Sequence, residues 1–474
     1  MTAPGHKLGI SLYSTSMINP IFGLGLVLVS LLPATADLDA DPIEVPQGVE
    51  CGLGKSFHMG RRAALREAVG DGLMVFRGLI DTRDYLSFHQ DKAVWYLTGI
   101  ESPNITLVMD AGTGEEILFL PKKNRGNESW EGEKWDAGDE WIELVSGFKD
   151  VRPTGELLKF LDERITEGDK VWTSLSAHIE LAGCFDRANP YDRNVKRDPL
   201  DGRSSREDAL AEQLTERFGA KVVNCGPQMN ELRRVKTSEE IDAMRKAAEI
   251  GADALAEAIR STRPGIGEWD LSALMTWVHL KGRAAGPAYG AIAGCGPNAN
   301  VLHYMAVTRP LGPAEMVLID YAPEYKHYTS DITRSWPTDG IFTPRMAELY
   351  DVVLESQLAG IAVVKPGATI GDVERACRKV LVDRGFGDLI RHGSCHYIGM
   401  EVHDVGDYGK KLVPGVAFTV EPGLYDEVNN IGIRIEDVVV VTEDGCEVIS
   451  DGVTKVRSEL TALVAEKGIL DMTE

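Results

Sequence analysis

Five side chains in the last third of the chain constrain its fold more than any other feature. They are four carboxylates and one imidazole, the residues Asp320, Asp331, His396, Glu421 and Glu436. An apolar run over 316–319 leads into Asp320, a polar turn follows, and Asp331 precedes the next apolar residues, which predicts a β-hairpin. Side chains that face each other across such a pair lie about 4.5–5.5 Å apart at Cβ. The hairpin would therefore aim both carboxylates at one point.

The same design recurs downstream and indicates an internal pseudo-repeat. Residues 418–420 lead into Glu421, a polar turn covers 425–430, and residues 433–435 lead into Glu436. Four carboxylates that converge in an interior raise one another's pKa, and metal coordination is the usual way to compensate such buried charge. With one imidazole, the donor set suits Mn, Co, Fe or Zn, and bridging carboxylates allow two ions about 3.5–4 Å apart. Each acid alone would more often be a surface residue at a strand end; their joint spacing favours the metal site.

Composition narrows the class of protein. A chain of 474 residues exceeds what one hydrophobic core usually supports, which predicts two domains. The formal net charge of −23 disfavours nucleic acid and anionic lipid as partners, since both are bound through clustered Lys and Arg. Seven scattered cysteines without a CxxC pair predict buried thiols, neither a zinc knuckle nor a disulfide framework. The chain also lacks a P-loop, a nucleophile elbow and an HExxH motif.

Helical periodicity frames the two hairpins. Thr237 and Glu240 have capping-box spacing, and apolar residues over 241–259 trace one face of a helix. Further amphipathic segments cover 271–278, 346–361 and 370–381. Helices that cover one curved sheet give an α+β layout.

Several stretches resemble the pita-bread metallopeptidases, and most closely the Xaa-Pro aminopeptidases. They are LIDYAPEYKHYTSDITRSWP, HGSCHYIGMEVHDVG, TVEPGLY and IGIRIEDVVVV. The resemblance implies a C-terminal pita-bread catalytic domain over 231–460, a curved antiparallel sheet covered by helices, after a smaller α/β creatinase-type domain over 41–226. It makes Asp320 a ligand of one metal ion, His396 and Glu421 ligands of the other, and Asp331 and Glu436 bridges between them.

The same resemblance implies roles for other residues. Catalytic roles fall to His303, His403, Glu421 and Arg434, and substrate contacts to Tyr289, His303, His403 and Tyr425, the two tyrosines as residues lining the pocket. The expected activity is hydrolysis of the bond between an N-terminal residue and a following proline, with two divalent ions, Mn²⁺ first and Co²⁺, Fe²⁺ or Zn²⁺ as alternatives. Peptides with proline at the second position are the expected partners, and a homodimer or homotetramer the expected assembly. The alternatives are a prolidase that acts on Xaa-Pro dipeptides and a non-catalytic pita-bread binding protein.

The N-terminal part carries no complete catalytic motif. An uncharged stretch with an apolar peak over 21–32, followed by Ala34, Thr35 and Ala36, predicts a signal peptide over 1–36. The protein would then be periplasmic or secreted; without cleavage it would be membrane-anchored or cytoplasmic. Strands are expected over 72–79, 105–109 and 116–121. The polar segment 187–207 is expected to be an exposed loop, with substrate contact as the alternative.

Overall fold

The structure is a computed structural model that describes residues 43–83 and 85–472. The signal peptide expected over residues 1–36 lies outside the described residues. Within the described part of the chain, no helix combines the length and the apolar content that crossing a membrane requires. Helices and strands are mixed in both halves, which confirms the predicted α+β class.

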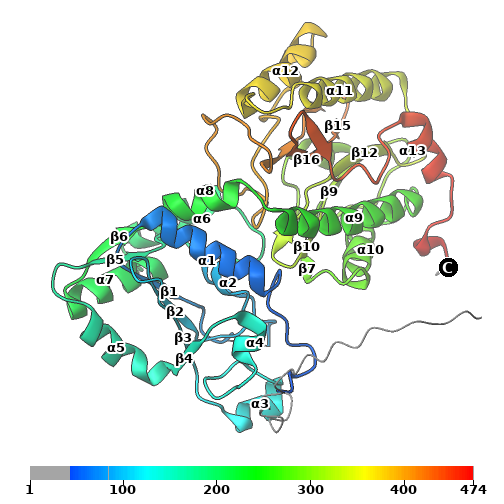
Figure 1. Cartoon of the computed structure of the whole chain (residues 1–474). Helices are drawn as coiled ribbons and strands as arrows, with labels where there is room; N and C mark the ends of the chain where they lie inside the picture. The colour runs from blue at the N-terminus through cyan, green and yellow to red at the C-terminus, as the bar shows by residue number, and fades with distance from the viewer. Residues whose placement is uncertain (1–42, 84, 473–474) are drawn as a thin grey trace, which may run out of the picture. The chain divides into compact units, whose positions relative to one another are not determined.

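A six-stranded sheet of order β4-β3-β2-β1-β5-β6 forms the centre of the N-terminal domain (Figure 1). Its strands are β1 (Leu73–Arg77), β2 (Thr106–Asp110), β3 (Glu116–Leu120), β4 (Asp150–Pro153), β5 (Lys170–Thr173) and β6 (Lys221–Asn224). β1, β2 and β3 pair antiparallel, whereas β4, β5 and β6 run parallel to the neighbours with which they pair. The three strands expected from the sequence are therefore the central ones, β3, β2 and β1.

Helices cover both faces of this sheet, because successive residues of a strand point to opposite sides. Met74 and Phe76 belong to the apolar cluster that includes α1 and α2, while Leu73 and Val75 pack with α5 and α7. The helical segments of this domain are α1 (Lys55–Val69), α2 (Lys92–Thr98), α3 (Arg125–Glu131), α4 (Ile142–Ser146), η1 (Thr154–Glu156), α5 (Leu157–Arg164), α6 (Phe185–Arg197) and α7 (Arg206–Phe218).

The exposed loop expected over 187–207 is wrong for its first half, which belongs to helix α6. This helix buries none of its side chains, so its polar composition reflects exposure to solvent and not an irregular backbone. Asp186 lies in its first turn and Lys196 and Arg197 in its last, which complements the helix dipole at both ends. Only residues 198–205 form the loop that leads to α7.

The second domain begins after α8 (Gly226–Arg234) and contains four short sheets. Their orders are β11-β10-β7, β12-β9-β8, β13-β16-β17 and β14-β15, and all of the pairs are antiparallel. The strands are β7 (Gly286–Pro287), β8 (Ile292–Cys295), β9 (Met316–Asp320), β10 (Pro323–Tyr325), β11 (Tyr328–Thr329), β12 (Thr333–Pro337), β13 (Ala417–Val420), β14 (Gly423–Asp426), β15 (Ile431–Arg434), β16 (Asp437–Val441) and β17 (Cys446–Val448).

Two pairs of nested hairpins match the predicted pseudo-repeat. In the first, β9 pairs with β12 and encloses the shorter β10–β11 hairpin; in the second, β13 pairs with β16 and encloses β14–β15. An antiparallel bridge between Thr333 and Glu436 joins the two repeats. This bridge brings the ends of the outer hairpins together, which is where the predicted metal ligands lie.

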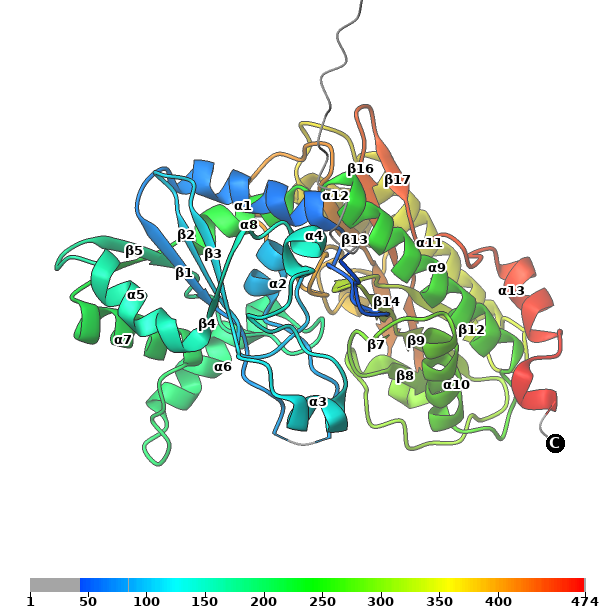
Figure 2. The same ribbon diagram turned by 60° about the horizontal axis from the view of Figure 1, so that its bottom comes forward.

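Helices pack on the outer side of these strands (Figure 2). Leu255 of α9, Met275 of α10, Val353 of α11 and Leu460 of α13 share one buried cluster with Ile319 of β9. Burying each such side chain stabilises the fold by about 1.5–3 kcal/mol. The helical segments of this domain are α9 (Ser238–Arg260), α10 (Glu268–Lys281), η2 (Gly296–Asn300), α11 (Pro344–Ala362), α12 (Ile370–Asp383), η3 (Gly387–Leu389), α13 (Arg457–Val464) and η4 (Ile469–Met472).

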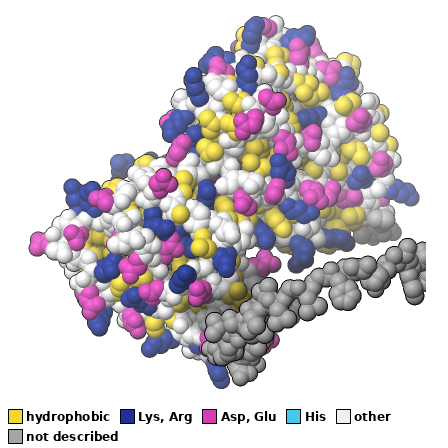
Figure 3. Space-filling model, in the orientation of Figure 1, with side chains coloured by type: hydrophobic (Ala, Val, Ile, Leu, Met, Phe, Trp, Pro, Cys, Tyr) yellow, Lys and Arg dark blue, Asp and Glu magenta, His cyan; other side chains and the backbone are white. Residues whose placement is uncertain are grey.

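Apolar and polar contacts join the two domains. Trp95 and Leu97 of α2 share a buried cluster with Met244 of α9, Tyr328 of β11 and Ile398. On the face shown in Figure 3, Lys and Arg side chains are interspersed with Asp and Glu and form no broad basic patch.

Candidate metal centre

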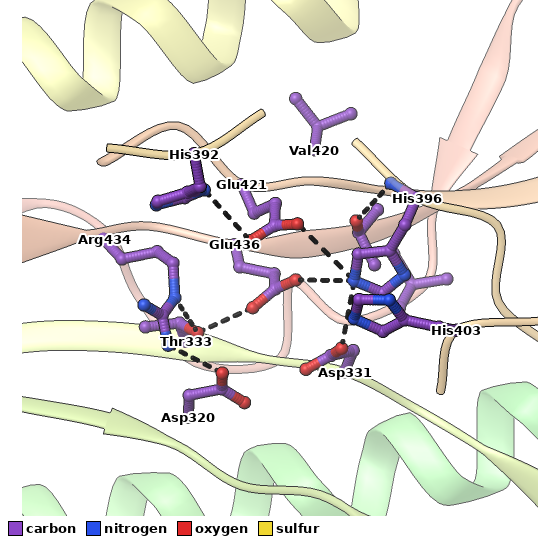
Figure 4. Close-up of polar contacts among 12 residues, drawn as sticks. Asp320, Asp331, Thr333, His392, His396, His403, Val420, Glu421, Arg434 and Glu436 are labelled. Atoms are coloured by element: carbon purple, nitrogen blue, oxygen red, sulfur yellow. Dashed lines mark hydrogen bonds and ion pairs between the residues drawn. The ribbon is translucent and has the colours of Figure 1, made fainter. Parts of the chain in front are cut away.

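The five predicted ligands converge at the ends of the outer hairpins (Figure 4). Asp320 ends β9 and Asp331 comes shortly before β12, whereas Glu421 directly follows β13 and Glu436 directly precedes β16. Their positions in the two repeats therefore correspond. His396 comes from the loop that pairs with β13, where Thr419 donates its backbone N–H to the His396 carbonyl.

The tautomer of His396 leaves a lone pair on Nε2 that is directed at three carboxylates. Its Nδ1 lies 3.1 Å from the backbone carbonyl of Tyr397, which can only accept, so Nδ1 carries the proton. The Nε2 lone pair then faces Asp331 Oδ2 at 3.5 Å, Glu421 Oε1 at 3.5 Å and Glu436 Oε1 at 3.8 Å. Four groups that can each donate an electron pair thus converge on one point. A cation resolves this arrangement, and the donors fit a divalent metal.

Burial and mutual repulsion set the charge state of the carboxylates. Burial raises the pKa of Asp331 well above its ordinary value, and the neighbouring Asp320 adds to the rise. Burial, with Asp331 and Asp320, has the same effect on the pKa of Glu436. Burial, followed by the charge of Glu436, raises the pKa of Glu421 to about 8. Positive charge in the site would relieve all three shifts.

Tyr289 holds the two aspartates together from one side. Its hydroxyl lies 2.6 Å from Asp320 Oδ1 and 2.7 Å from Asp331 Oδ1. Burial and the two carboxylates raise its pKa well above the ordinary value, so the phenol keeps its proton and donates it to one aspartate at a time. Tyr289 thereby fixes the carboxylates before any ion arrives.

Arg434 and Thr333 hold the outer edge of the site. Arg434 Nη2 donates to Asp320 Oδ2 at 2.7 Å, and its Nε donates to Thr333 Oγ1 at 3.2 Å. The Thr333 hydroxyl in turn donates to Glu436 Oε2 at 2.6 Å. The remaining carboxylate oxygen, Glu436 Oε1, is buried and has no hydrogen-bond partner among the described residues. That unpartnered oxygen faces His396, where a metal would accept it as a ligand.

A buried hydrogen-bond chain runs from Arg434 to His392. Arg434 Nη1 donates to the Tyr425 hydroxyl at 2.9 Å, and that hydroxyl lies 2.7 Å from His392 Nε2. His392 Nδ1 faces the Gly393 carbonyl at 2.7 Å and so carries the proton, which leaves Nε2 to accept from Tyr425. The resemblance implies that Tyr425 lines the pocket, but Tyr425 is fully buried behind the wall residues Arg434 and His392.

A cavity of about 450 Å³ opens over the carboxylates. Among its walls are His303 and His403, together with Tyr289, Arg434 and the five predicted ligands. The His403 ring stacks on the His396 ring at 4.0 Å with an interplanar angle of 18°. Burial, with the neighbouring His396, lowers the pKa of His403 to about 4, so His403 is a neutral hydrogen-bonding group at neutral pH.

Three wall residues from the N-terminal domain are absent from the sequence expectations, Cys184, Asp186 and Arg187. Arg187 Nη2 donates to His303 Nδ1 at 3.0 Å, and Asp186 Oδ2 lies 3.3 Å from His403 Nδ1. Since the guanidinium can only donate, His303 carries its proton on Nε2. The sequence leaves substrate contact by residues 187–207 open, but it does not indicate these two histidine partners, because each contact spans more than a hundred residues of sequence.

The fold and the site define a metallopeptidase. The sequence matches the model of metallopeptidase family M24 over residues 242–443 and that of the aminopeptidase P N-terminal domain over 58–172. Such enzymes use divalent metal ions, in agreement with the donor set described above.

Comparison with similar proteins identifies the branch of this metallopeptidase family. The chain is 31% identical over 448 residues to the Xaa-Pro aminopeptidase of Escherichia coli, covering 85% of this chain and 96% of that protein. The structure of Pseudomonas aeruginosa aminopeptidase PepP matches with a TM-score of 0.74 and 30% identity, covering 89% and 99% of the two chains. That of E. coli aminopeptidase P with the inhibitor Pro-Leu matches with a TM-score of 0.73 and 28% identity, covering 87% and 98%. The chain belongs to the Xaa-Pro aminopeptidase family of metal-dependent hydrolases.

Proposed function

We propose that this chain removes the first residue of peptides that have proline at the second position, using two Mn²⁺ ions. The observation that carries the proposal is the lone pair of His396 Nε2, which faces three carboxylate oxygens in a buried site. In this proposal Asp320 binds one ion, His396 and Glu421 bind the other, and Asp331 and Glu436 bridge them. When bound, the two ions polarise the scissile carbonyl and lower the pKa of water far below its bulk value of about 15.7.

The protein's own groups then orient the substrate. His303 and His403 are neutral hydrogen-bonding groups on the cavity wall, because burial lowers the pKa of both. His303 can donate its Nε2–H to a substrate carbonyl oxygen and stabilise the negative charge that develops on it, whereas His403, whose Nδ1–H faces Asp186, offers its Nε2 as a hydrogen-bond acceptor. Glu421 accepts protons readily, because its pKa is raised to about 8 in the metal-free site. Once bound to metal it would be ionised, and it lines the cavity, where it can take the proton that the attacking water gives up and pass it to the leaving amine.

A proline-specific pocket has a physical rationale. A peptide bond to proline is a tertiary amide with no N–H and a fixed φ, so a site built around an N–H donor cannot recognise it. The cavity offers aromatic and apolar surface from Tyr289, Ile292 and Leu302 on one side of the carboxylates. We propose that the proline ring packs there. Tyr425 then acts from behind the wall, where it holds Arg434 and His392.

The test uses protein stripped of metal and reloaded with Mn²⁺. Three substrates are compared: an Xaa-Pro-Yaa peptide, the same peptide with alanine in place of proline, and an Xaa-Pro dipeptide. We expect metal-dependent cleavage of the first and little cleavage of the other two. Cleavage of the dipeptide alone would identify a prolidase, and no cleavage despite bound metal would identify a non-catalytic binding protein. Reloading with Co²⁺, Fe²⁺ or Zn²⁺ tests the choice of metal.

Domain limits and assembly also remain proposals. We propose a signal peptide over 1–36, an N-terminal domain over 41–226 and a catalytic domain over 231–460. N-terminal sequencing of the protein recovered from the native host tests cleavage and export. We propose a homo-oligomer, dimer or tetramer, which light scattering coupled to size-exclusion chromatography tests.

A further inference from the structure

The turn of the first inner hairpin has an unusual backbone. Lys326 and His327 connect β10 to β11, and both have positive φ, 49° and 63°. A two-residue hairpin turn of this kind favours Asn-Gly, because its central residues adopt the left-handed conformation. A side chain with a Cβ pays roughly 1–2 kcal/mol there. Such a conformation persists only where the surroundings hold it in place.

Two residues of the N-terminal domain hold His327. Its ring stacks on the Trp95 indole at 4.2 Å with an interplanar angle of 24°. Its Nε2 lies 2.5 Å from Glu101 Oε2. Burial lowers the pKa of His327 well below its ordinary value, so the ring is neutral and Nε2–H donates to the carboxylate. The strained turn thus places the buried side chain of His327 against the N-terminal domain.

A second contact lies beside the first on the same hairpin. Glu324 of β10 lies 2.6 Å from His89 Nε2 and 3.5 Å from Lys92 Nζ, and its side chain is buried. His89, Glu324 and His327 are close enough to suggest a metal site. The distances favour hydrogen bonds instead, since His396 stands 3.5–3.8 Å from its carboxylates whereas His89 stands 2.6 Å from Glu324. The Lys92 ammonium already supplies Glu324 with a cation.

This hairpin connects two of the predicted metal ligands. It begins shortly after Asp320 and ends shortly before Asp331. Its Thr329 N–H donates to the Gly399 carbonyl at 3.0 Å, on the loop between His396 and His403. A shift of the turn would therefore move both aspartates and reach the histidine loop.

We propose that His327 is a positioning residue for the metal centre: held by Trp95 and Glu101, it fixes the hairpin between Asp320 and Asp331. The N-terminal domain thereby sets the geometry of a site to which this hairpin contributes ligands. The expected change in kcat rests on the proposed function. The expected change in metal affinity does not.

The test replaces His327 with glycine and measures Mn²⁺ affinity by calorimetry, the visible spectrum of the Co²⁺-loaded protein, and kcat and KM separately. Glycine suits the positive φ of the turn, so backbone strain falls while the contact is lost. We expect Mn²⁺ affinity and kcat to fall by about tenfold each, the effect of losing a group that orients ligands. KM should change little, and the Co²⁺ spectrum should shift.

Two further variants separate the contact from the turn. Asn430 has a positive φ of 55° and lies exposed at the tip of the second inner hairpin, so Asn430→Gly is a matched control that should leave affinity unchanged. His327→Asn keeps a donor for Glu101 and tolerates the left-handed conformation, so it should restore part of the loss. Wild-type Mn²⁺ affinity in His327→Gly, or an equal loss in Asn430→Gly, would overturn the proposal. If the wild-type enzyme cleaves no Xaa-Pro peptide, the affinity and spectral comparisons still decide it.

Discussion

At the scale of single residues, the charge of the site explains why it needs metal. The four carboxylates of Asp320, Asp331, Glu421 and Glu436 face the guanidinium of Arg434, which donates to Asp320 at 2.7 Å. With every group ionised, four negative charges and one positive charge leave about −3 in a buried cavity. In the metal-free site protons supply part of the missing charge, since the pKa of Glu421 is raised to about 8. Bound divalent cations would displace these protons and compensate the ionised carboxylates.

Asp331→Asn tests the proposed bridge between the ions. The amide keeps the shape of the side chain but loses its charge, so we expect fewer than two Mn²⁺ per chain in metal analysis of the dialysed protein. We expect kcat to fall about a thousandfold, since the ions supply several kcal/mol of stabilisation and about 1.4 kcal/mol is tenfold in rate. Asp383→Asn, an exposed acid on α12, is the control and should match the wild type. Two bound ions with full activity in Asp331→Asn would contradict the assignment.

Removing the metal should make stability depend on pH. In the metal-free fold the pKa of Glu421 is raised to about 8 and those of Asp331 and Glu436 also rise, whereas unfolded carboxyls titrate near about 4. A raised folded-state pKa stabilises the fold below the unfolded pKa, and this stability is lost as pH rises through the folded pKa. The melting temperature of the metal-free protein should therefore fall between about pH 4 and pH 8, by several degrees at about 2–4 °C per kcal/mol.

Thermal melts with and without Mn²⁺ across that range measure the effect. Added Mn²⁺ should restore the melting temperature most strongly at the alkaline end. A metal-free melting temperature that rises steadily over the same pH interval would contradict the charge states assigned to the carboxylates.

At the scale of elements, nested hairpins and one helix terminus build the site. Each outer hairpin places one acid at the end of its first strand and another before its second, so the two repeats supply the four carboxylates as matched pairs. Helix α6 then adds Asp186 and Arg187 from the N-terminal domain at the opposite wall. The hairpins position the proposed metal ligands, and the contacts of Asp186 and Arg187 determine which ring nitrogen of His403 and of His303 carries the proton.

Arg187→Gln tests that role of α6. Burial lowers the pKa of His303, and the Arg187 charge lowers it further, so loss of the charge should raise the pKa of His303 towards its ordinary value. An NMR titration of the ¹³C-labelled histidine ring measures the change, with His303→Gln to assign the signal. Arg193→Gln, farther along α6 and absent from the cavity wall, is the matched control. An unchanged His303 titration in Arg187→Gln would show that the contact has no electrostatic effect.

At the scale of the whole molecule, a buried network of ion pairs connects helix α8, which lies between the two domains in the sequence, to the loop that contains His396 and His403. Arg233 of α8 pairs with Asp404 at 2.5 Å and with Glu401, and Lys236 pairs with Asp404 at 3.3 Å. All four side chains are buried, and Glu401 and Asp404 flank His403. The segment between the domains thus supports the loop that lines the cavity.

Arg233→Met should strongly destabilise the protein. It leaves Glu401 and Asp404 with less compensation in the interior, and breaking a buried pair in this way costs about 3–5 kcal/mol. Arg245→Met removes a solvent-exposed pair with Glu447 and should cost about 0–1 kcal/mol. Chemical unfolding monitored by fluorescence compares the two. Equal stability of the two variants would mean that the buried network contributes little.

The local spacing of the chain determined the catalytic framework. The apolar runs around Asp320 and Glu421 predicted the hairpins, and the helical period after Thr237 predicted α9, because strand and helix periodicities are properties of neighbouring residues. The structure brings all five predicted ligands together, with His303, His403 and Arg434 on the same cavity.

Only the tertiary structure decided which side chains distant in the sequence contact the wall histidines and the first inner hairpin. Arg187 reaches His303 across 116 residues, Asp186 reaches His403 across 217, and His327 meets Glu101 across 226. The burial of Tyr425 behind the wall is a result of the same kind. Such contacts depend on how two domains and their loops pack, and no local period in the sequence encodes that packing. The sequence therefore determined the proposed ligands of the metal centre, and the packing of the domains decided which other groups surround them.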